Sequence, residues 1–286
     1  MAAFPTGLPV LPRPLVEDPV PGAPSTANAA CVLASIDEAI DAAREGEASC
    51  VVTNPISKAV LHRAGFPLPG HTEYLAQRLA SDEGEDGAPP LPVMMLVGGG
   101  VRVGLATIHT PLRDVPDALN TDDLVRTALI VHQALIRDFG AASPKIAFTG
   151  LNPHAGESGD IGREEIEIIN PAAARLRDDH GVDISDALSA DALFAPHERS
   201  RFDGIIAMYH DQGLIPVKAL DFDGGVNVTL GLPIVRTSPD HGVAFGIAGK
   251  GKARPDSLIA ALRLAAEIAE RRRAAADDAA LETTAR

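Results

Sequence analysis

FDGIIAMYHDQGLIPVK, residues 202–218, joins a short apolar run to an abrupt polar ending. The run from Gly204 to Met208 contains two isoleucines and predicts a buried strand of a parallel sheet. The polar ending begins at Tyr209 and contains His210 and Asp211. In an open α/β sheet, ligands bind just beyond the carboxyl ends of the strands. The His-Asp pair is therefore a candidate for a functional site.

Two other stretches have the same arrangement. The strand-like run 101–108 leads into His109, and the strand-like run 145–149 leads through a short turn into His154. Each histidine alone is more typical of a hydrogen-bonded loop residue, and there is no HExxH pattern or other short ligand pair. Three neutral imidazoles that converge from strand ends could hold a divalent cation with positions left open for a substrate.

Composition limits the class of protein. The chain has 286 residues with 25 Lys and Arg against 39 Asp and Glu, a formal net charge of −14, which argues against a nucleic-acid binder. No run approaches 18 uninterrupted apolar residues, so no membrane span is predicted. The N-terminus lacks a basic region followed by an apolar core. A soluble cytoplasmic protein is expected, and any anionic substrate must meet a local cationic pocket.

The remaining elements alternate in the manner of an α/β fold. Proline-rich residues 1–26 predict an extended lead-in, and triple glycine 98–100 predicts the turn of a β-hairpin. Residues 271–286 are alanine-rich and charged and are expected to fray. Helices are predicted over 25–48, from Thr72 past residue 79, over 121–139, over 164–177 with a kink at Pro171, and over 256–270; further strands are predicted over 50–53, 224–230 and 234–238.

Candidate anion-binding residues lie near several of these elements. Lys218, Asn227 and Arg236 are spaced nine apart beside apolar runs and could together bind a phosphate or carboxylate. For Lys218 alone, solvated surface charge is the favoured interpretation. His71 and Thr72 open a predicted helix, whose free N–H groups favour anions, although a plain cap is also possible there. Residues 246–253 nearly fit a nucleotide-binding phosphate loop, but Ala253 replaces the required Ser or Thr, and we reject that function.

Several long motifs resemble the 4-hydroxythreonine-4-phosphate dehydrogenase family of vitamin B6 biosynthesis. They are GHTEYLA (70–76), ATIHTPLRDV (106–115), GLNPHAGESG (150–159), AMYHDQGLIPVK (207–218) and GVNVTLGLPIVRTSPDHG (225–242). The resemblance implies NAD-dependent oxidation of a phosphorylated hydroxy-amino acid, 4-phosphohydroxy-L-threonine. The 3-hydroxyl would become a ketone, and the resulting β-keto acid would lose CO₂ to give 3-amino-2-oxopropyl phosphate.

The resemblance also implies roles for individual residues. His109, His154 and His210 match the ligands of a divalent metal (Zn, Mg or Co), contributed by the two subunits of a homodimer. The positions that match the substrate site are His71, Thr72, Lys218, Asn227 and Arg236, with Asp191 and Asp211 beside it. We take Asp211 and Lys218 as the candidate catalytic residues, although the residue that accepts the hydroxyl proton does not follow from the sequence.

The segment 241–255 resembles the cofactor loop HGxAxxIAGKG of isopropylmalate and isocitrate dehydrogenases. This implies a two-domain fold of that type, with a mixed, largely parallel sheet and helices on both faces. It also implies that NAD or NADP binds near His241, Gly242, Gly249 and Lys250, with Gly246 in place of an acid that relatives often carry. The expected domains are 1–66 plus 240–286 on the cofactor side and 67–239 for substrate, metal and dimer contacts.

Two alternatives stay open. A related enzyme could oxidise a phosphorylated four-carbon sugar acid, such as threonate or erythronate 4-phosphate, with the same metal and phosphate residues. A binding protein without catalytic activity could hold the metal or the phosphorylated ligand without reducing NAD. The chain lacks the opening strand and GDPAGIG-type turn usual in the family, so either its start is misassigned or it is a shortened form with an incomplete first domain.

Overall fold

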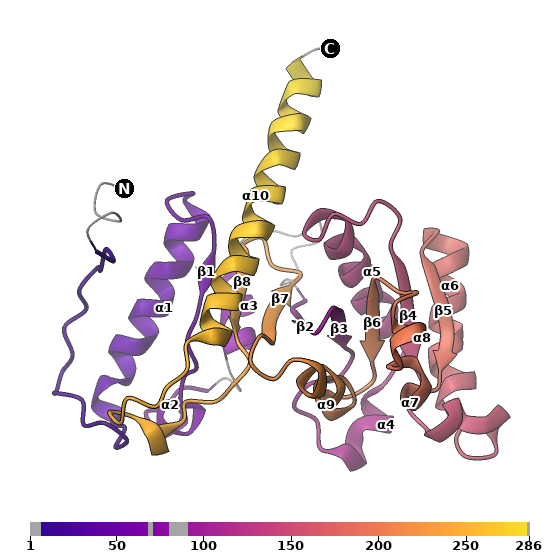
Figure 1. The fold of residues 1–286 in the computed structure, drawn as a ribbon, viewed down its shortest axis with the longest axis horizontal. Helices are drawn as coiled ribbons and strands as arrows, with labels where there is room; N and C mark the ends of the chain where they lie inside the picture. Colours follow the sequence, from indigo (N-terminus) through magenta and orange to yellow (C-terminus); the bar gives the residue numbers. More distant parts are fainter. Residues whose placement is uncertain (1–6, 68–70, 80–90, 285–286) are drawn as a thin grey trace.

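The described residues form one eight-stranded sheet (Figure 1). The computed structural model describes residues 7–67, 71–79 and 91–284, without the side chains of 71–73 and 279–284. The strand order is β1-β8-β7-β2-β3-β6-β4-β5. The strands are β1 (Val51–Val52), β2 (Val93–Gly98), β3 (Val101–Leu105), β4 (Lys145–Thr149), β5 (Asp183–Leu188), β6 (Gly204–Ala207), β7 (Val226–Leu230) and β8 (Arg236–Pro239).

Strand directions confirm the predicted α/β fold with a mixed sheet. β3, β6, β4 and β5 are neighbours that run parallel to one another, and β1 is parallel to β8. β2 is antiparallel to β3 and β7, and β7 is antiparallel to β8. The predicted hairpin is β2–β3, which turns at Gly99 and Gly100; both have positive φ, which glycine adopts without steric cost. The two-domain division stays a prediction.

Helices cover both faces of the sheet (Figure 1). They are α1 (Ala29–Arg44), α2 (Lys58–Arg63), α3 (His71–Leu79), α4 (Val115–Ala118), α5 (Thr121–Arg137), α6 (Asn170–His180), α7 (Ala190–Leu193), α8 (Pro196–Arg199), α9 (His210–Leu220) and α10 (Asp256–Thr284). Shorter helical turns are Thr26–Asn28, Leu112–Asp114, Pro153–Gly159, Phe245–Ile247 and a π-helical turn, Glu165–Ile169.

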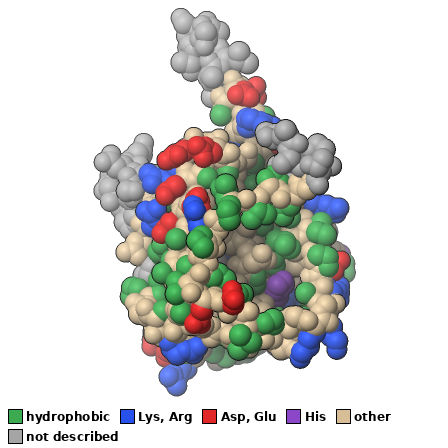
Figure 2. Space-filling model, turned by 90° about the vertical axis from the view of Figure 1, so that its left-hand side faces the viewer, with side chains coloured by type: hydrophobic (Ala, Val, Ile, Leu, Met, Phe, Trp, Pro, Cys, Tyr) green, Lys and Arg blue, Asp and Glu red, His purple; other side chains and the backbone are tan. Residues whose placement is uncertain are grey.

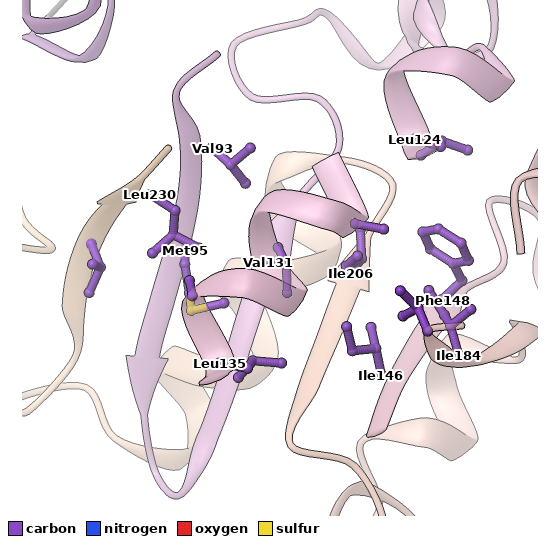
Figure 3. Packing of buried hydrophobic residues seen from close by; sticks show 14 of the residues in the cluster. Val93, Met95, Leu124, Val131, Leu135, Ile146, Phe148, Ile184, Ile206 and Leu230 are labelled. Atoms are coloured by element: carbon purple, nitrogen blue, oxygen red, sulfur yellow. The ribbon is translucent and has the colours of Figure 1, made fainter. Parts of the chain in front are cut away.

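The main core lies between the sheet and helices α5, α6 and α10. Figure 3 shows Val131 and Leu135 of α5 against side chains of the central strands. The close approach depends on glycine, because a Cβ at Gly204 would lie 2.9 Å from Leu135 Cδ1 and one at Gly104 would lie 2.9 Å from Val131 Cγ2. Each such fully buried aliphatic side chain stabilises the fold by about 1.5–3 kcal/mol.

The opposite face carries α9 and, farther along the sheet, α1 and α3. Leu214 and Val217 of α9 are buried against β2, β3 and β6. A Cβ at Gly213 would lie 2.6 Å from Leu105 Cδ2, so this glycine lets the helix reach the sheet. α9 therefore starts directly at the carboxyl end of β6, with His210 as its first residue.

The closing helix corrects one prediction. Residues 271–286 were expected to fray, yet α10 continues to Thr284. Arg272 donates from Nε and Nη2 to the two carboxylate oxygens of buried Asp138 over 2.7 and 2.8 Å, beyond the predicted end of the helix. A buried ion pair with two hydrogen bonds thus keeps this part of α10 helical where the local composition does not favour it.

Within the described residues, no helix has the length and apolar character to cross a membrane.

Candidate active site at the carboxyl edge of the sheet

The three predicted histidines follow three adjacent parallel strands. His109 comes after β3, His210 after β6 and His154 after β4, and these strands are neighbours in the order β3-β6-β4. Their carboxyl ends therefore lie along one edge of the sheet, with α9, α7 and α4 at that edge in the lower part of Figure 1. This is the edge at which ligands bind in α/β sheets.

Side chains tie the three strand ends together. Thr107 Oγ1, after β3, donates to Met208 O, after β6, over 2.8 Å. Gln212 Oε1 accepts from Met208 N and Thr149 Oγ1, both over 2.7 Å. Its Nε2 donates to Gly150 O over 2.7 Å. Gln212 thus links the first turn of α9 to the end of β4, a role with no local sequence signal because its partners on β4 are about sixty residues away in the chain.

His109 and His210 face each other across this edge. Their ring centroids are 6.0 Å apart, with an angle of 37° between the planes. His210 Nδ1 lies 2.7 Å from Asp211 Oδ1. A carboxylate at Nδ1 favours the tautomer that leaves a lone pair on Nε2, the form that ligates metals. The predicted catalytic residue Asp211 therefore contacts His210 and is suited to orient its ring.

His154 lies in a left-handed turn, His154–Ser158, in which all five residues have positive φ. Its Nδ1 is 3.1 Å from Glu157 Oε2, so its Nε2 is also left for a ligand. The hydrogen bond that His154 donates to the Glu157 carboxylate raises the pKa of His154 above its ordinary value. Asp191 at the start of α7 is a neighbour: its pKa is lowered chiefly by the Ser189 hydroxyl, and the charge of His154 adds to the effect.

Only part of the predicted metal site forms within one chain. In the described part of the chain, no three His, Cys, Asp or Glu side chains lie close enough together to hold a metal ion. His109 and His210 are near each other, whereas His154 belongs to the neighbouring turn. The donor chemistry nevertheless fits a divalent ion, because two of the three imidazoles have Nδ1 held by a carboxylate.

Arg236 is a buried cation on β8. Its exposed fraction is 3% and its hydrogen-bond partners are hydroxyls: Nη1 donates to Thr229 Oγ1 over 2.9 Å and Nη2 to Thr53 Oγ1 over 2.8 Å. Burial lowers its pKa to about 10. Its Nε and the Oδ1 of Asn227 are buried without a hydrogen-bond partner among the described residues. A desolvated guanidinium with no carboxylate bound to it is suited to receive an anion.

Lys218 lies on α9, and its ammonium group is already paired. Nζ is 3.2 Å from Asp240 Oδ2 and donates to Asp240 O over 3.1 Å. Asp240 follows β8, so the pair links α9 to the strand that carries Arg236. No local sequence signal singles out Asp240, because its link to Lys218 spans 22 residues.

The side chains of His71 and Thr72 lie outside the described residues. The helix they open, α3, begins at His71, one residue before the predicted start. Farther along, α3 is bonded to α1: Tyr74 Oη donates to Asp37 Oδ1 over 2.5 Å, and Arg78 donates to both Asp37 and Asp41.

The predicted cofactor loop borders a large pocket. His241 Nδ1 lies 2.9 Å from Gly242 O, and Lys250 Nζ donates to Gly246 O over 2.6 Å. The pocket, of about 840 Å³, lies between residues 13–39, residues 51–61 and the loop side chains Val243, Phe245 and Ala248. Figure 2 shows the hollowed face on this side of the molecule, with hydrophobic side chains around the hollow. Its size suits a nucleotide, although the predicted residues His241, Gly242, Gly249 and Lys250 do not line it.

Comparisons with known proteins agree on one family. A family model described as pyridoxal phosphate biosynthetic protein PdxA matches residues 3–265. The chain is 58% identical over 250 residues to a 4-hydroxythreonine-4-phosphate dehydrogenase from Maricaulis maris, covering 87% of this chain and 73% of the relative. It superposes on the crystal structure of such an enzyme from Klebsiella pneumoniae with a TM-score of 0.76 and 38% identity, covering 87% of this chain and 73% of the other.

A solved structure with a different printed activity is also similar. It is a terephthalate 1,2-cis-dihydrodiol dehydrogenase from Burkholderia xenovorans, with a TM-score of 0.62 and 34% identity, covering 86% of this chain and 75% of the other. Both solved structures carry the name of a dehydrogenase that acts on a hydroxylated substrate.

Proposed function

The chain belongs to the family of the pyridoxal phosphate biosynthetic protein PdxA, and on this premise we propose that it is a 4-hydroxythreonine-4-phosphate dehydrogenase. The proposed reaction is the NAD- and metal-dependent oxidation of 4-phosphohydroxy-L-threonine at its 3-hydroxyl. NAD, when bound, would accept the hydride, and a residue acting as a base would take the hydroxyl proton. The β-keto acid then loses CO₂ and leaves 3-amino-2-oxopropyl phosphate.

The observation that carries the proposal is the buried guanidinium of Arg236. Its partners are the hydroxyls of Thr53 and Thr229, and its Nε is unbonded among the described residues. Burial of a cation without an anion is unfavourable, so a protein retains it where a ligand supplies the charge. A substrate phosphate or carboxylate fits this need, and Asn227 and Lys218 are the proposed further contacts.

His109, His154 and His210 are the proposed holders of a divalent ion. Such an ion, when bound, lowers the pKa of a substrate hydroxyl and polarises the ketone that follows. Asp211 and Glu157 hold the Nδ1 atoms of His210 and His154, so that the Nε2 atoms face outward as ligands. Asp211 and Lys218 stay the candidates for moving protons near the reacting carbon.

A homodimer would bring together the histidines that one chain leaves apart. Ile215 and Phe222 on and just after α9 are 66% and 76% exposed, and Leu112 beside His109 is also exposed. Large apolar side chains in solvent near a site are typical of an interface. We propose that a second subunit covers them and supplies its His154 turn to the pair His109 and His210.

The nucleotide is placed, in this proposal, along the loop 241–251 and its adjoining pocket. Gly249 has a φ of +72°, and a Cβ there would lie 3.0 Å from Pro21 Cβ, so the loop backbone has to be glycine at this point. The N–H groups of Ile247, Ala248 and Lys250 bond within the loop, and other backbone N–H groups of the loop are the proposed contacts to the pyrophosphate. NAD is the proposed cofactor, with NADP as the alternative.

A second candidate is a dehydrogenase for a different hydroxylated acid, such as a phosphorylated four-carbon sugar acid. The likeness to a structure named for a dihydrodiol substrate favours this alternative, because one fold then serves more than one substrate. It would use the same histidines and differ in the contact to the substrate amine.

The test is NADH formation with 4-phosphohydroxy-L-threonine, measured before and after chelation and in His210→Ala. His197→Ala, which removes an exposed histidine on α8, is the matched control. We expect turnover in the parent chain and the control, and none in the chelated protein or His210→Ala. Turnover only with erythronate or threonate 4-phosphate would select the second candidate. Substrate binding without turnover in any condition would indicate a binding protein.

A further inference from the structure

The left-handed turn that carries His154 is an unfavourable conformation for its sequence. His154, Ala155, Glu157 and Ser158 all have φ between 43° and 59°, and only Gly156 adopts such values without steric cost. Runs of this kind persist only where surrounding contacts over-determine them, and they concentrate at functional sites. The contacts that hold this turn therefore set where His154 points.

One buried carboxylate lies at the centre of those contacts. Glu165 is 2% exposed, and its Oε1 accepts from the backbone N–H groups of Leu151 and Asn152, each over 2.8 Å. Its Oε2 accepts from Asn152 Nδ2 over 3.0 Å. Three N–H donors thus converge on one acidic side chain, at the entrance to the turn.

The turn itself packs directly on this carboxylate. A Cβ at Gly156 would lie 2.6 Å from Glu165 Oε2, and one at Gly150 would lie 3.0 Å from Oε1 and 2.8 Å from Ala155 Cα. Glu165 also belongs to the π-helical turn Glu165–Ile169, a rare local structure that is frequent at functional sites. The carboxylate fills the space between the entrance of the turn and its middle.

We propose that Glu165 is a positioning residue for the metal site: it holds the turn 154–158 left-handed and thereby presents His154 Nε2 to a divalent cation. Glu165 does not touch the cation; it acts through His154, whose Nδ1 is held by Glu157. The inference rests on the proposed function, because it assigns a role toward the metal that the proposed reaction requires.

Glu165→Gln tests the inference, with Glu167→Gln as control. Glu167 lies in the same π-helical turn but is exposed and pairs with Arg163. Co²⁺ affinity is measured by calorimetry on the full-length protein, and amide hydrogen exchange over 151–160 is measured without metal. We expect Glu165→Gln to weaken Co²⁺ binding about tenfold or more and to speed exchange in this segment. Glu167→Gln should stay within about twofold of the parent.

A double-mutant cycle separates positioning from a general structural effect. In a His154→Ala background, Glu165→Gln should cause no further loss of Co²⁺ affinity, since the residue through which it acts is gone. If Glu165→Gln does not fold, Asn152→Ser, which removes one of the three donors, takes its place and should show the same pattern.

The outcomes distinguish the inference from the function on which it rests. A parent chain that binds no Co²⁺ contradicts the metal-dependent function, and the inference with it. If Glu165→Gln binds Co²⁺ as tightly as the parent, and its amide exchange over 151–160 is the same as in the parent, the inference is overturned. The proposed function is then left intact. Equal loss of affinity with and without His154 also overturns it, because Glu165 would then act on stability and not on the ligand.

Discussion

The guanidinium of Arg236 donates from Nη2 to Thr53 Oγ1 over 2.8 Å, across 183 residues of chain. Arg236 lies on β8 and Thr53 directly follows β1, the strand that pairs with β8 at the edge of the sheet. The hydroxyl fixes the orientation of the guanidinium but supplies no negative charge to compensate it. The molecule therefore holds a cation ready for an anion, at a cost to its own stability.

Replacement of this cation should separate binding from stability. Arg236→Met keeps much of the side-chain volume and removes the charge. We expect KM for the phosphorylated substrate to rise by a factor of about 10–100, since a charge-assisted hydrogen bond contributes roughly 1.5–3 kcal/mol. The melting temperature should stay equal or rise, because an unpaired buried charge is gone. Arg126→Met, at an exposed surface pair with Asp123, is the control and should change neither quantity.

The same residue predicts a pH dependence of stability. Burial lowers the pKa of Arg236 from its ordinary value to about 10, so above pH 10 the unfolded chain binds more protons than the folded one. The penalty for the buried charge is fully present below pH 10 and is relieved as the pH rises above that value. The difference in unfolding free energy between Arg236→Met and the parent should therefore shrink in this window. Urea denaturation at a series of pH values measures it, and a constant difference would contradict the assignment.

Gln212 should contribute to stability more than its place beside His210 suggests. Gln212→Leu removes the partners of Met208 N and Gly150 O at once and leaves Thr149 Oγ1 with only its 3.4 Å bond to Ile206 O. Buried polar groups left without partners cost about 1–3 kcal/mol each, so we expect a loss of at least 2 kcal/mol. Gln133→Leu changes an exposed glutamine on α5 and should stay within about 0.5 kcal/mol. Urea denaturation compares the two, and equal stabilities would refute the role of Gln212.

The strand ends followed from local sequence because apolar runs with turn residues mark buried parallel strands. β4 and β6 begin and end close to the predicted residues, and the hairpin β2–β3 turns at its glycines. β5 was missed because it is an edge strand that alternates Asp and Ser with apolar residues. α9 was missed because Gly213 and Pro216 are poor helix formers, and its formation depends on contact with the sheet.

The candidate site was less accessible to sequence reasoning. Adjacent parallel strands place three histidines at one edge, but the 6.0 Å approach of His109 and His210 depends on tertiary packing. The left-handed turn at His154 was not predicted, since Gly156 is the only one of its five residues that favours positive φ. Glu157, three residues after His154, was the one local signal for a carboxylate on that ring.

Asp138 should account for the order of the second half of α10. Burial alone would raise the pKa of Asp138, but the hydrogen bonds from Arg272 and Arg137 outweigh it, and the pKa is lowered. The contribution of ionised Asp138 to the free energy of unfolding is thus present above the ordinary carboxyl pKa and is lost as the pH falls through the lowered pKa. Asp138→Asn should cost about 3–5 kcal/mol at neutral pH.

The control for this variant is Asp122→Asn, at an exposed pair with Arg175, which should cost less than about 1 kcal/mol. Hydrogen exchange locates the effect. Faster exchange in Asp138→Asn should appear in residues 265–278 of α10. Unchanged exchange there would show that another contact orders the end of the helix.

Gly246 offers a test of the cofactor loop. It stands where the resembling dehydrogenases often carry an acid, its φ is not in the left-handed region, and a Cβ there would meet nothing within 4 Å. Gly246→Glu should therefore fold as the parent does.

An acid near the adenosine ribose accepts a hydrogen bond from its 2′-hydroxyl and repels a 2′-phosphate. We expect NADH to bind more tightly and NADPH more weakly, each by about tenfold, the size of one hydrogen bond to a charged group. Fluorescence titration of both nucleotides measures this, with Gly7→Glu as a control at another open position. Equal shifts for both nucleotides, or none, would place the ribose away from residue 246 and contradict the proposed course of the cofactor along the loop 241–251.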